Sequence, residues 1–238
     1  MFFWIIATLS AFFIKGLCGF ANTLVFDSIL TFGNNNINVS PVEVLLGYPT
    51  NIIMTIKERK SIKPSICIPL SILVIAGSIP GVFLLKSIDA SVVKVIFGVV
   101  VILIGIEMLI REISDKKIKS SKIVLIIIGL LSGILCGLYG IGALLGAYIS
   151  RVSDNTKEFK ANICAVFIVE NTFRIILYFV TGIMTIEVLK QFFILVPFML
   201  IGLFIGIKCS NVMDDKMAKK IVIVMLIISG AALIVNNI

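Results

Sequence analysis

Phe13–Phe20 reads FIKGLCGF and Ser132–Gly142 reads SGILCGLYGIG, so a Leu-Cys-Gly core occurs twice in the chain. Each copy lies in the middle of an apolar segment, where a membrane-spanning helix would be most deeply buried. Glycine inside a helix costs on the order of 1 kcal/mol relative to alanine, and in lipid the backbone leaves the helical state only where protein or a wet cavity satisfies it. The two stretches therefore predict breaks in membrane helices that face one shared cavity.

A second interpretation of the same glycines is close helix packing. Gly129, Gly133 and Gly137 form a ladder of small residues at four-residue spacing, which is typical of closely packed helices in membranes. Gly77, Gly81, Gly202 and Gly206 favour the same use in other segments.

The composition indicates an all-α integral membrane protein with one transmembrane domain over residues 1–238. Hydrophobic residues make up 59 % of the chain and charged residues 14 %, against roughly 25 % charged in soluble domains. The net charge of +8 lies in loops between apolar segments, where membrane orientation explains it, so no nucleic-acid partner is expected. We expect the protein in the cell (inner) membrane, as a multi-pass chain in contact with the lipid bilayer.

The residue types for several kinds of chemistry are absent or scattered. The chain has no histidine, and its five cysteines form no CxxC motif, so neither a metal site nor a disulfide framework is expected. No phosphate-binding loop or nucleophile elbow occurs. We therefore expect a protein without cofactors that is not an enzyme.

Apolar runs divide the chain into eight segments. They lie near residues 2–32, 42–56, 65–85, 92–110, 123–149, 161–181, 187–207 and 218–236. A single crossing needs roughly 20 residues, so the first and fifth segments are too long for one span and too short for two. These two also contain the repeated glycine stretches.

The chain has the pattern of an internal duplication, with one repeat at about 1–112 and the other at about 120–238. An offset of 125 residues pairs five like residues: Gly77 with Gly202, Gly81 with Gly206, Asp89 with Asp214, Lys94 with Lys219, and Gly105 with Gly230. An offset of 118 pairs Cys18 with Cys136, and an offset of 120 pairs Asn51 with Asn171.

Loop charge favours re-entrant hairpins for the first and fifth segments, because lysine and arginine gather on the cytoplasmic side. Eight single crossings would leave 10 basic loop residues on one side and 8 on the other. If the two long segments turn back, 16 basic residues share one side and 2 lie on the other. This topology places both termini outside and makes the two four-segment repeats inverted, a plan that recurs in secondary transporters.

The hairpin tips predict a site for a small anion, because a returning helix begins with unpaired N–H groups and a positive dipole end. Donors are expected after Gly19, with Asn22 and Thr23 in the first turn, and after Gly140, near Gly142. Lys15 either adds positive charge or extends to the cytoplasmic face.

Polar residues in the second and sixth segments are further candidates. Asn51 and Asn171 recur in both halves and are expected to line the pore. Glu170 and Arg174 have the spacing that allows a helical ion pair. This pair is either structural or divides into an anion ligand, Arg174, and a proton acceptor, Glu170. Glu43, Glu107 and Asp27 are expected to contact solvent or lipid headgroups.

The residues Gly16-Leu17-Cys18-Gly19-Phe20-Ala21 and Gly133–Gly142, together with the two-half layout, resemble the sulfite exporter TauE/SafE-like (TSUP) family of small multispan permeases. The resemblance implies transport of a small sulfur-containing or carboxylate anion. The first copy has Ala21-Asn22 where the second has Tyr139-Gly140, and fuller Gly-x-Gly-x-Gly runs are usual in that family.

The sequence thus predicts a secondary transporter for a small sulfite, sulfonate or carboxylate anion, coupled to protons and working by alternating access. The predicted substrate-binding residues are Lys15, Gly19, Asn22, Thr23, Asn51, Gly140, Gly142, Asn171 and Arg174, with Glu170 as the coupling residue. One alternative is a membrane thiol-disulfide redox carrier that uses Cys18 and Cys136. Another is a subunit of a larger assembly. Substrate, direction and a homo-oligomeric state stay open.

Overall fold

The first apolar segment forms two helices instead of one long helix. In the computed structural model, α1 (Phe2–Cys18) ends at Gly19, and α2 (Asn22–Thr31) begins three residues later. Gly19 has a φ of 90°, and its N–H donates to the carbonyl of Lys15. Glycine adopts this left-handed conformation at no steric cost, which makes it the usual residue just beyond a helix end. The predicted break in the first segment is therefore present.

The fifth segment also forms two helices. Helix α6 (Lys122–Tyr139) ends shortly before α7 (Ala143–Val152), whose N-cap is Gly142. The structure describes residues 1–31, 39–84, 122–139 and 142–235, with isolated helical positions between 95 and 110. The predicted segment near 92–110 therefore lies largely outside the described residues.

The remaining helices agree with the predicted apolar segments to within a few residues. They are α3 (Val39–Lys57), α4 (Pro64–Leu84), α8 (Thr156–Val180), α9 (Ile186–Val212) and α10 (Asp215–Val235). The short 3-10 turn η1 (Arg59–Ser61) lies in the connection between α3 and α4. No strand occurs in the part of the chain that the structure describes. The predicted all-α class is confirmed.

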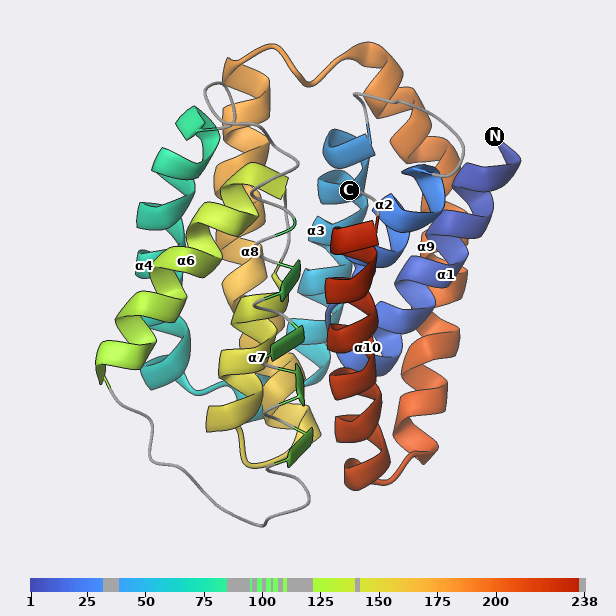
Figure 1. Cartoon of the computed structure of the whole chain (residues 1–238). Coiled ribbons are helices and arrows are strands. Elements are labelled where there is room, and N and C mark those ends of the chain that lie inside the picture. Colours follow the sequence, from blue (N-terminus) through green and yellow to red (C-terminus); the bar gives the residue numbers. More distant parts are fainter. Residues whose placement is uncertain are drawn as a thin grey trace.

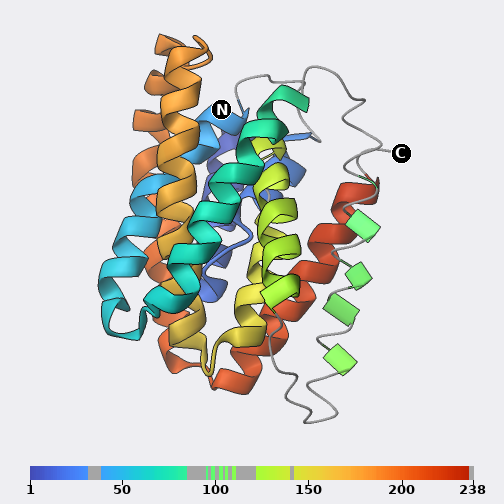
Figure 2. The same cartoon turned by 90° about the vertical axis from the view of Figure 1, so that its left-hand side faces the viewer.

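The helices run up and down between two ends of a bundle (Figure 1). The N-terminus, the start of α3 and the connection between α8 and α9 lie at the upper end, whereas the connections α3–α4, α7–α8 and α9–α10 lie at the lower end. Helix α2 turns back toward the end at which α1 begins, and α7 runs back toward the lower end. Helix α10 stands at one edge of the bundle (Figure 2).

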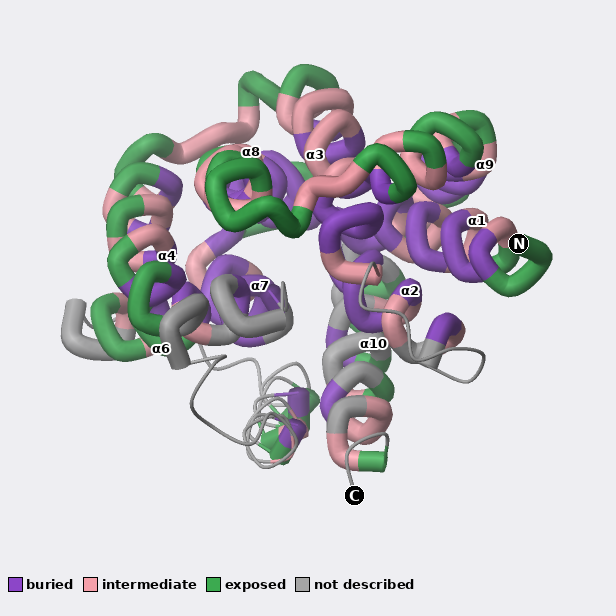
Figure 3. Tube along the Cα trace, turned by 90° about the horizontal axis from the view of Figure 1, so that it is seen from above, coloured by how far each residue is buried: buried purple, intermediate pink, exposed green. Residues whose placement is uncertain are grey.

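Two tight helix pairs flank a central pair (Figure 3). Helices α1 and α9 form one flanking pair, α4 and α6 form the other, and α3 and α8 contact each other between them. Glycines allow both flanking pairs to approach closely. A Cβ atom on Gly206 would lie 2.2 Å from the carbonyl oxygen of Phe13, and one on Gly133 would lie 2.3 Å from that of Val74.

The glycines of the fifth segment therefore fit both interpretations of the sequence. Gly129 and Gly133 pack against α4, as a ladder of small residues predicts. Helix α6 nevertheless ends at Tyr139, beyond that ladder.

A polar clamp fixes the lower end of the bundle. Lys63 Nζ lies 2.9 Å from Asp154 Oδ2 and 2.8 Å from Glu158 Oε1, and the backbone N–H of Lys63 donates to Asn162 Oδ1. Hydrogen bonds to the two carboxylates raise the pKa of Lys63 above its ordinary value. The clamp joins the connection after α3 to the start of α8.

Two of the described helices, Thr156–Val180 and Ile186–Val212, are long and apolar enough to cross a bilayer by length and composition. Shorter apolar stretches occur at Phe2–Cys18, Pro64–Pro80 and Leu125–Ile134. Many large apolar side chains on α4, α6, α8 and α9 are exposed, Ile72, Ile127, Phe179 and Phe204 among them. An apolar outer surface of this kind matches a lipid environment rather than water.

Candidate functional site

The two helix breaks face one polar cavity in the middle of the fold. Helix α2 begins at the first break and α7 at the second, while α3 and α8 supply the other walls. The cavity is lined by Lys15, Phe20, Ala21, Asn22, Thr23, Leu24, Glu43, Asn51, Gly142, Phe167, Asn171 and Arg174. It therefore joins residues from both halves of the chain.

Helical periodicity explains why α3 and α8 contribute these side chains. Glu43, Gly47 and Asn51 follow one another at four-residue spacing on α3, and Phe167, Asn171 and Arg174 follow at four and three on α8. Such spacings place side chains on one face of a helix. The two faces meet, because a Cβ on Gly47 of α3 would lie 3.5 Å from Nδ2 of Asn171 on α8.

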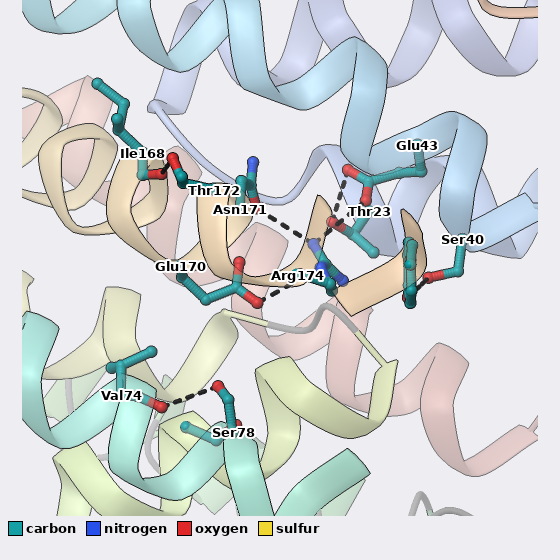
Figure 4. Close-up of polar contacts among 12 residues, drawn as sticks. Thr23, Ser40, Glu43, Val74, Ser78, Ile168, Glu170, Asn171, Thr172 and Arg174 are labelled. Atoms are coloured by element: carbon teal, nitrogen blue, oxygen red, sulfur yellow. Dashed lines mark hydrogen bonds and ion pairs between the residues drawn. The ribbon is translucent and has the colours of Figure 1, made fainter. Parts of the chain in front are cut away.

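A network of charged and amide groups crosses the cavity (Figure 4). Glu43 Oε1 accepts hydrogen bonds from Asn22 Nδ2 and from Thr23 Oγ1, the latter at 2.9 Å. Glu43 Oε2 lies 3.8 Å from Arg174 Nη2. The start of α2 is thereby bound to α3 and α8 through one carboxylate.

Arg174 connects this carboxylate to two more groups on its own helix. Its Nε lies 3.4 Å from Glu170 Oε1, and its Nη2 donates to Asn171 Oδ1 at 3.2 Å. The pairing of Glu170 with Arg174 that their spacing predicted is present. Both side chains are buried, at 2 % and 4 % exposure.

Lys15 points into the protein and not toward solvent. It is 1 % exposed, its Nζ donates to the carbonyl of Gly47 at 3.4 Å, and it lies 5.9 Å from the centre of the Phe12 ring. The alternative that Lys15 extends to the cytoplasmic face is therefore wrong. Its length reaches α3 from α1, which brings a second cation to the cavity.

Asn51 is a buried side chain whose amide makes no hydrogen bond to the described residues. It is 1 % exposed and lines the cavity, yet neither Nδ2 nor Oδ1 has a hydrogen-bond partner among the described residues. Arg174 Nη1 is likewise without a hydrogen bond there. Buried polar groups in proteins are almost always paired, so donors and an acceptor are available for something that enters the cavity.

The cavity is small in this conformation. It offers about 20 Å³ of space to the centre of a water molecule, which is room for little more than one water. Ala21, on its wall, has a φ of 70°, a conformation that residues other than glycine rarely adopt. Backbone outliers of this kind cluster at functional sites.

Most of the predicted site residues meet at this cavity. Lys15, Asn22, Thr23, Asn51, Gly142, Asn171 and Arg174 line it, and Glu170 contacts Arg174 beside it. Gly19 is not a lining residue, because it caps α1 and its open side faces Lys160, whose Cγ would lie 2.9 Å from a Cβ there. Gly140 lies outside the described residues.

Two charged residues were misjudged from the sequence. Glu43 was expected at a solvated segment end but is 2 % exposed and lies at the centre of the network. Lys160 was counted as a loop charge but is 6 % exposed, and its Nζ donates to the carbonyl of Gly16 and to Ser210 Oγ. Their spacing to Asn51 and Asn171 on the same helix faces was the available signal. Glu107 lies outside the described residues.

The two cysteines of the Leu-Cys-Gly cores do not occupy matched positions. Helix α1 ends at Cys18, whereas α6 continues three residues beyond Cys136, to Tyr139. Cys18 lies near Lys160, and Cys136 lies near the carboxylates of Glu170 and Glu43. Cys18 and Cys136 are both buried, and the thiol-disulfide alternative stays a prediction.

The arrangement is suited to holding a small anion. Two cations, two amides and the first turn of α2 converge on one buried space, and no three metal-ligating side chains gather among the described residues. Helix N-termini and guanidinium groups are standard ligands for oxyanions.

Comparison with known families gave one match. The model of the family described as "Sulfite exporter TauE/SafE" matches residues 4–233, which is nearly the entire chain. Comparisons with curated proteins and with solved structures gave no match.

Proposed function

Since the chain belongs to the sulfite exporter TauE/SafE family of membrane transporters, we propose that it is a permease for a small sulfur-containing or organic anion of the sulfite, sulfonate or carboxylate type. The observation that carries this proposal is the buried cavity between the helix breaks. There Lys15, Arg174 and Asn51, whose amide has no hydrogen-bond partner in the described part of the chain, face one space. The substrate would bind to these groups and to the starts of α2 and α7.

The proposed transport cycle is alternating access around this cavity. Asn171 lies about 22 Å along α8 from its first residue and about 14 Å from its last, at 1.5 Å per residue. Asn51 lies about 18 Å from the first residue of α3 and about 9 Å from its last, so both side chains stand inside their helices rather than at the ends. A space for one water cannot hold a sulfite ion. Substrate entry therefore requires the walls to separate, and the structure corresponds to a closed state in this scheme.

The charges around the cavity support a proposal of proton coupling. Lys15 and Arg174 are balanced by Glu43 and Glu170, and an added anion would leave one uncompensated negative charge in a buried place. Such a charge is costly unless it is neutralised. We propose that a proton accompanies the anion, with Glu170 as a proton acceptor.

We further propose the inverted-repeat plan and the membrane orientation predicted from the sequence. Matching packing supports the repeat: a Cβ on Gly77 would lie 2.3 Å from the carbonyl oxygen of Leu130, and one on Gly202 would lie 2.6 Å from that of Leu9. Basic residues at the connection after α3, such as Arg59 and Lys60, favour the lower end in Figure 1 as the cytoplasmic end. Both termini would then lie outside.

Anion flux into liposomes that contain the purified protein tests the proposal. Asn51→Ala and Asn171→Ala should abolish sulfite and sulfonate flux while insertion stays intact, because each removes a polar group from the cavity wall. Ile52→Ala and Thr172→Val are matched controls from neighbouring positions that do not line the cavity, and they should retain flux. Normal flux in both asparagine variants would remove these residues from the site.

A double variant separates permease from redox carrier. Cys18→Ser together with Cys136→Ser should leave anion flux largely intact, because neither thiol lines the cavity. Loss of all activity in this variant, with normal insertion, would favour the redox carrier instead. The absence of flux when the wild-type chain is reconstituted alone would favour a subunit of a larger assembly.

A further inference from the structure

The carboxylate of Glu43 already occupies the anion-binding groups of the cavity. One oxygen accepts from Asn22 and Thr23 in the first turn of α2, and the other faces the guanidinium of Arg174. A negative group at a helix start is stabilised by the free N–H groups and by the helix dipole. An incoming carboxylate, sulfite or sulfonate would need these same donors.

The donors around Glu43 are not fully used by it. Arg174 Nη1 and both polar atoms of Asn51 have no hydrogen bond among the described residues, although both side chains are at least nine-tenths buried. A purely structural ion pair inside a protein is expected to have its surrounding polar groups satisfied. The spare groups lie on the same cavity wall as Glu43, so the cavity can coordinate more than Glu43 alone provides.

The small volume of the cavity also indicates that a bound anion and Glu43 compete for the same donors. The cavity has room for about one water beside the Glu43 side chain. Glu43 Oε1 already accepts the side-chain hydrogen bonds of Asn22 and Thr23. An oxyanion and the Glu43 carboxylate cannot both hold the donors at the start of α2.

We propose that Glu43 is an internal counter-anion, which holds the donors of Asn22, Thr23 and Arg174 in the empty site and is displaced from them when the transported anion binds. This inference rests on the proposed function of anion transport. It assigns to Glu43 a role that differs from that of Glu170, which contacts Arg174 but none of the donors of α2.

The charged groups around Glu43 set the cost of its displacement. They are Lys15 on α1 and Glu170 and Arg174 on α8, with the thiol of Cys136 on α6, while Asn22 and Thr23 contact Glu43 from α2. When an anion takes the donors, the Glu43 carboxylate loses its hydrogen bonds and its contact with Arg174, and this loss weakens anion binding.

The test is anion binding to the purified full-length protein, measured by calorimetry. Methanesulfonate is the first probe, because its charge stays constant over the neutral range, and acetate and sulfite are further probes. Glu43→Gln keeps the size and the acceptor oxygen but removes the competing charge, so it should bind methanesulfonate about tenfold tighter or more than the wild type does.

Two further variants keep the proposal falsifiable. Glu43→Asp keeps the charge but withdraws it from the donors, so binding should tighten, which gives a readout if Glu43→Gln does not fold. Glu158→Gln is the matched control, because it removes a buried carboxylate that pairs with Lys63 at the lower end of the bundle. It should bind like the wild type.

The outcomes separate this inference from the proposed function. Unchanged or weaker binding in Glu43→Gln, with normal binding by the wild type, would overturn the role of Glu43 and leave anion transport in place. Binding that appears in Glu43→Gln and is undetectable in the wild type would support it. Absence of binding in every variant and with every probe would overturn both proposals.

Discussion

Replacing Gly142 with alanine should drive a methyl group into the aromatic wall of the cavity. A Cβ there would lie 2.1 Å from Phe167 Cζ and 2.4 Å from Cε1. Carbon atoms in contact prefer about 3.5–4.0 Å, so the ring would have to move by about 1.4 Å or more. The backbone of Gly142 has a φ of −98°, which alanine accepts, and the cost therefore comes from the contact with Phe167.

The expected magnitude is that of an overpacked core position. Such substitutions cost about 1–3 kcal/mol, and 1 kcal/mol lowers Tm by about 2–4 °C in a chain of this size. We therefore expect Gly142→Ala to lower Tm by roughly 2–12 °C. The displaced ring has little free space in the cavity, so anion flux should fall as well.

A double-mutant cycle with Phe167→Leu tests the reasoning. Leucine lacks the ring atoms that the new methyl group would meet, so Gly142→Ala should cost less than about 0.5 kcal/mol in the Phe167→Leu background. Thermal unfolding of the four proteins in one detergent, with flux measured in parallel, gives the coupling. An equal loss of Tm in both backgrounds would refute the contact as the cause, and no loss in either would refute the placement of Gly142 against Phe167.

Three further predictions address other parts of the molecule. Gly206→Ala should lower Tm by several degrees, because its Cβ would lie 2.2 Å from the carbonyl oxygen of Phe13 and α1 and α9 must separate. The control Ile205→Ala, at an exposed position, should have almost no effect, and a similar Tm for both variants would contradict the close crossing. Lys160→Met should lower the free energy of unfolding by about 1.5–3 kcal/mol, because hydrogen bonds to a buried charge contribute about this much. Lys157→Met, at an exposed position, is the control, and equal stability of the two variants would argue against the contacts of Lys160 with Gly16 and Ser210. In a cysteine-free background, Lys60→Cys should react with a membrane-impermeant reagent from the cytoplasmic side and Met184→Cys from outside; labelling of both from one side would exclude the proposed topology.

The positions of the helices were accessible to sequence reasoning because each boundary has a local cause. Apolar runs end at charged or turn residues, and the break after Cys18 is set by a glycine that adopts a left-handed conformation. The repeated glycine stretch indicated both breaks without any knowledge of tertiary contacts. The exact register of the repeat was not accessible, because α1 and α6 extend to different points beyond their cysteines: α1 ends at Cys18 and α6 at Tyr139.

The members of the cavity were predictable where polar residues stand inside apolar segments. Asn51, Asn171 and Arg174 are costly in such places, so their positions alone indicated a site. Glu43 was missed because it lies four residues from the start of α3, where a carboxylate is usually solvated. The return of α2 buries it; the spacing of Glu43 to Asn51 places both on one face of α3, but it does not indicate that α2, 20 residues earlier, covers that face. Lys160 was missed for the same reason, since the end of α1 covers it.

The close crossings of α1 with α9 and of α4 with α6, which glycines allow, favour movement of each helix pair as one unit. Each joins a helix of the first half to a helix of the second, α1 with α9 and α4 with α6. A rocking motion that separated the chain at its midpoint would pull both crossings apart. If the cavity opens alternately to either side, the rigid units are therefore the mixed pairs, which slide past each other along α3 and α8.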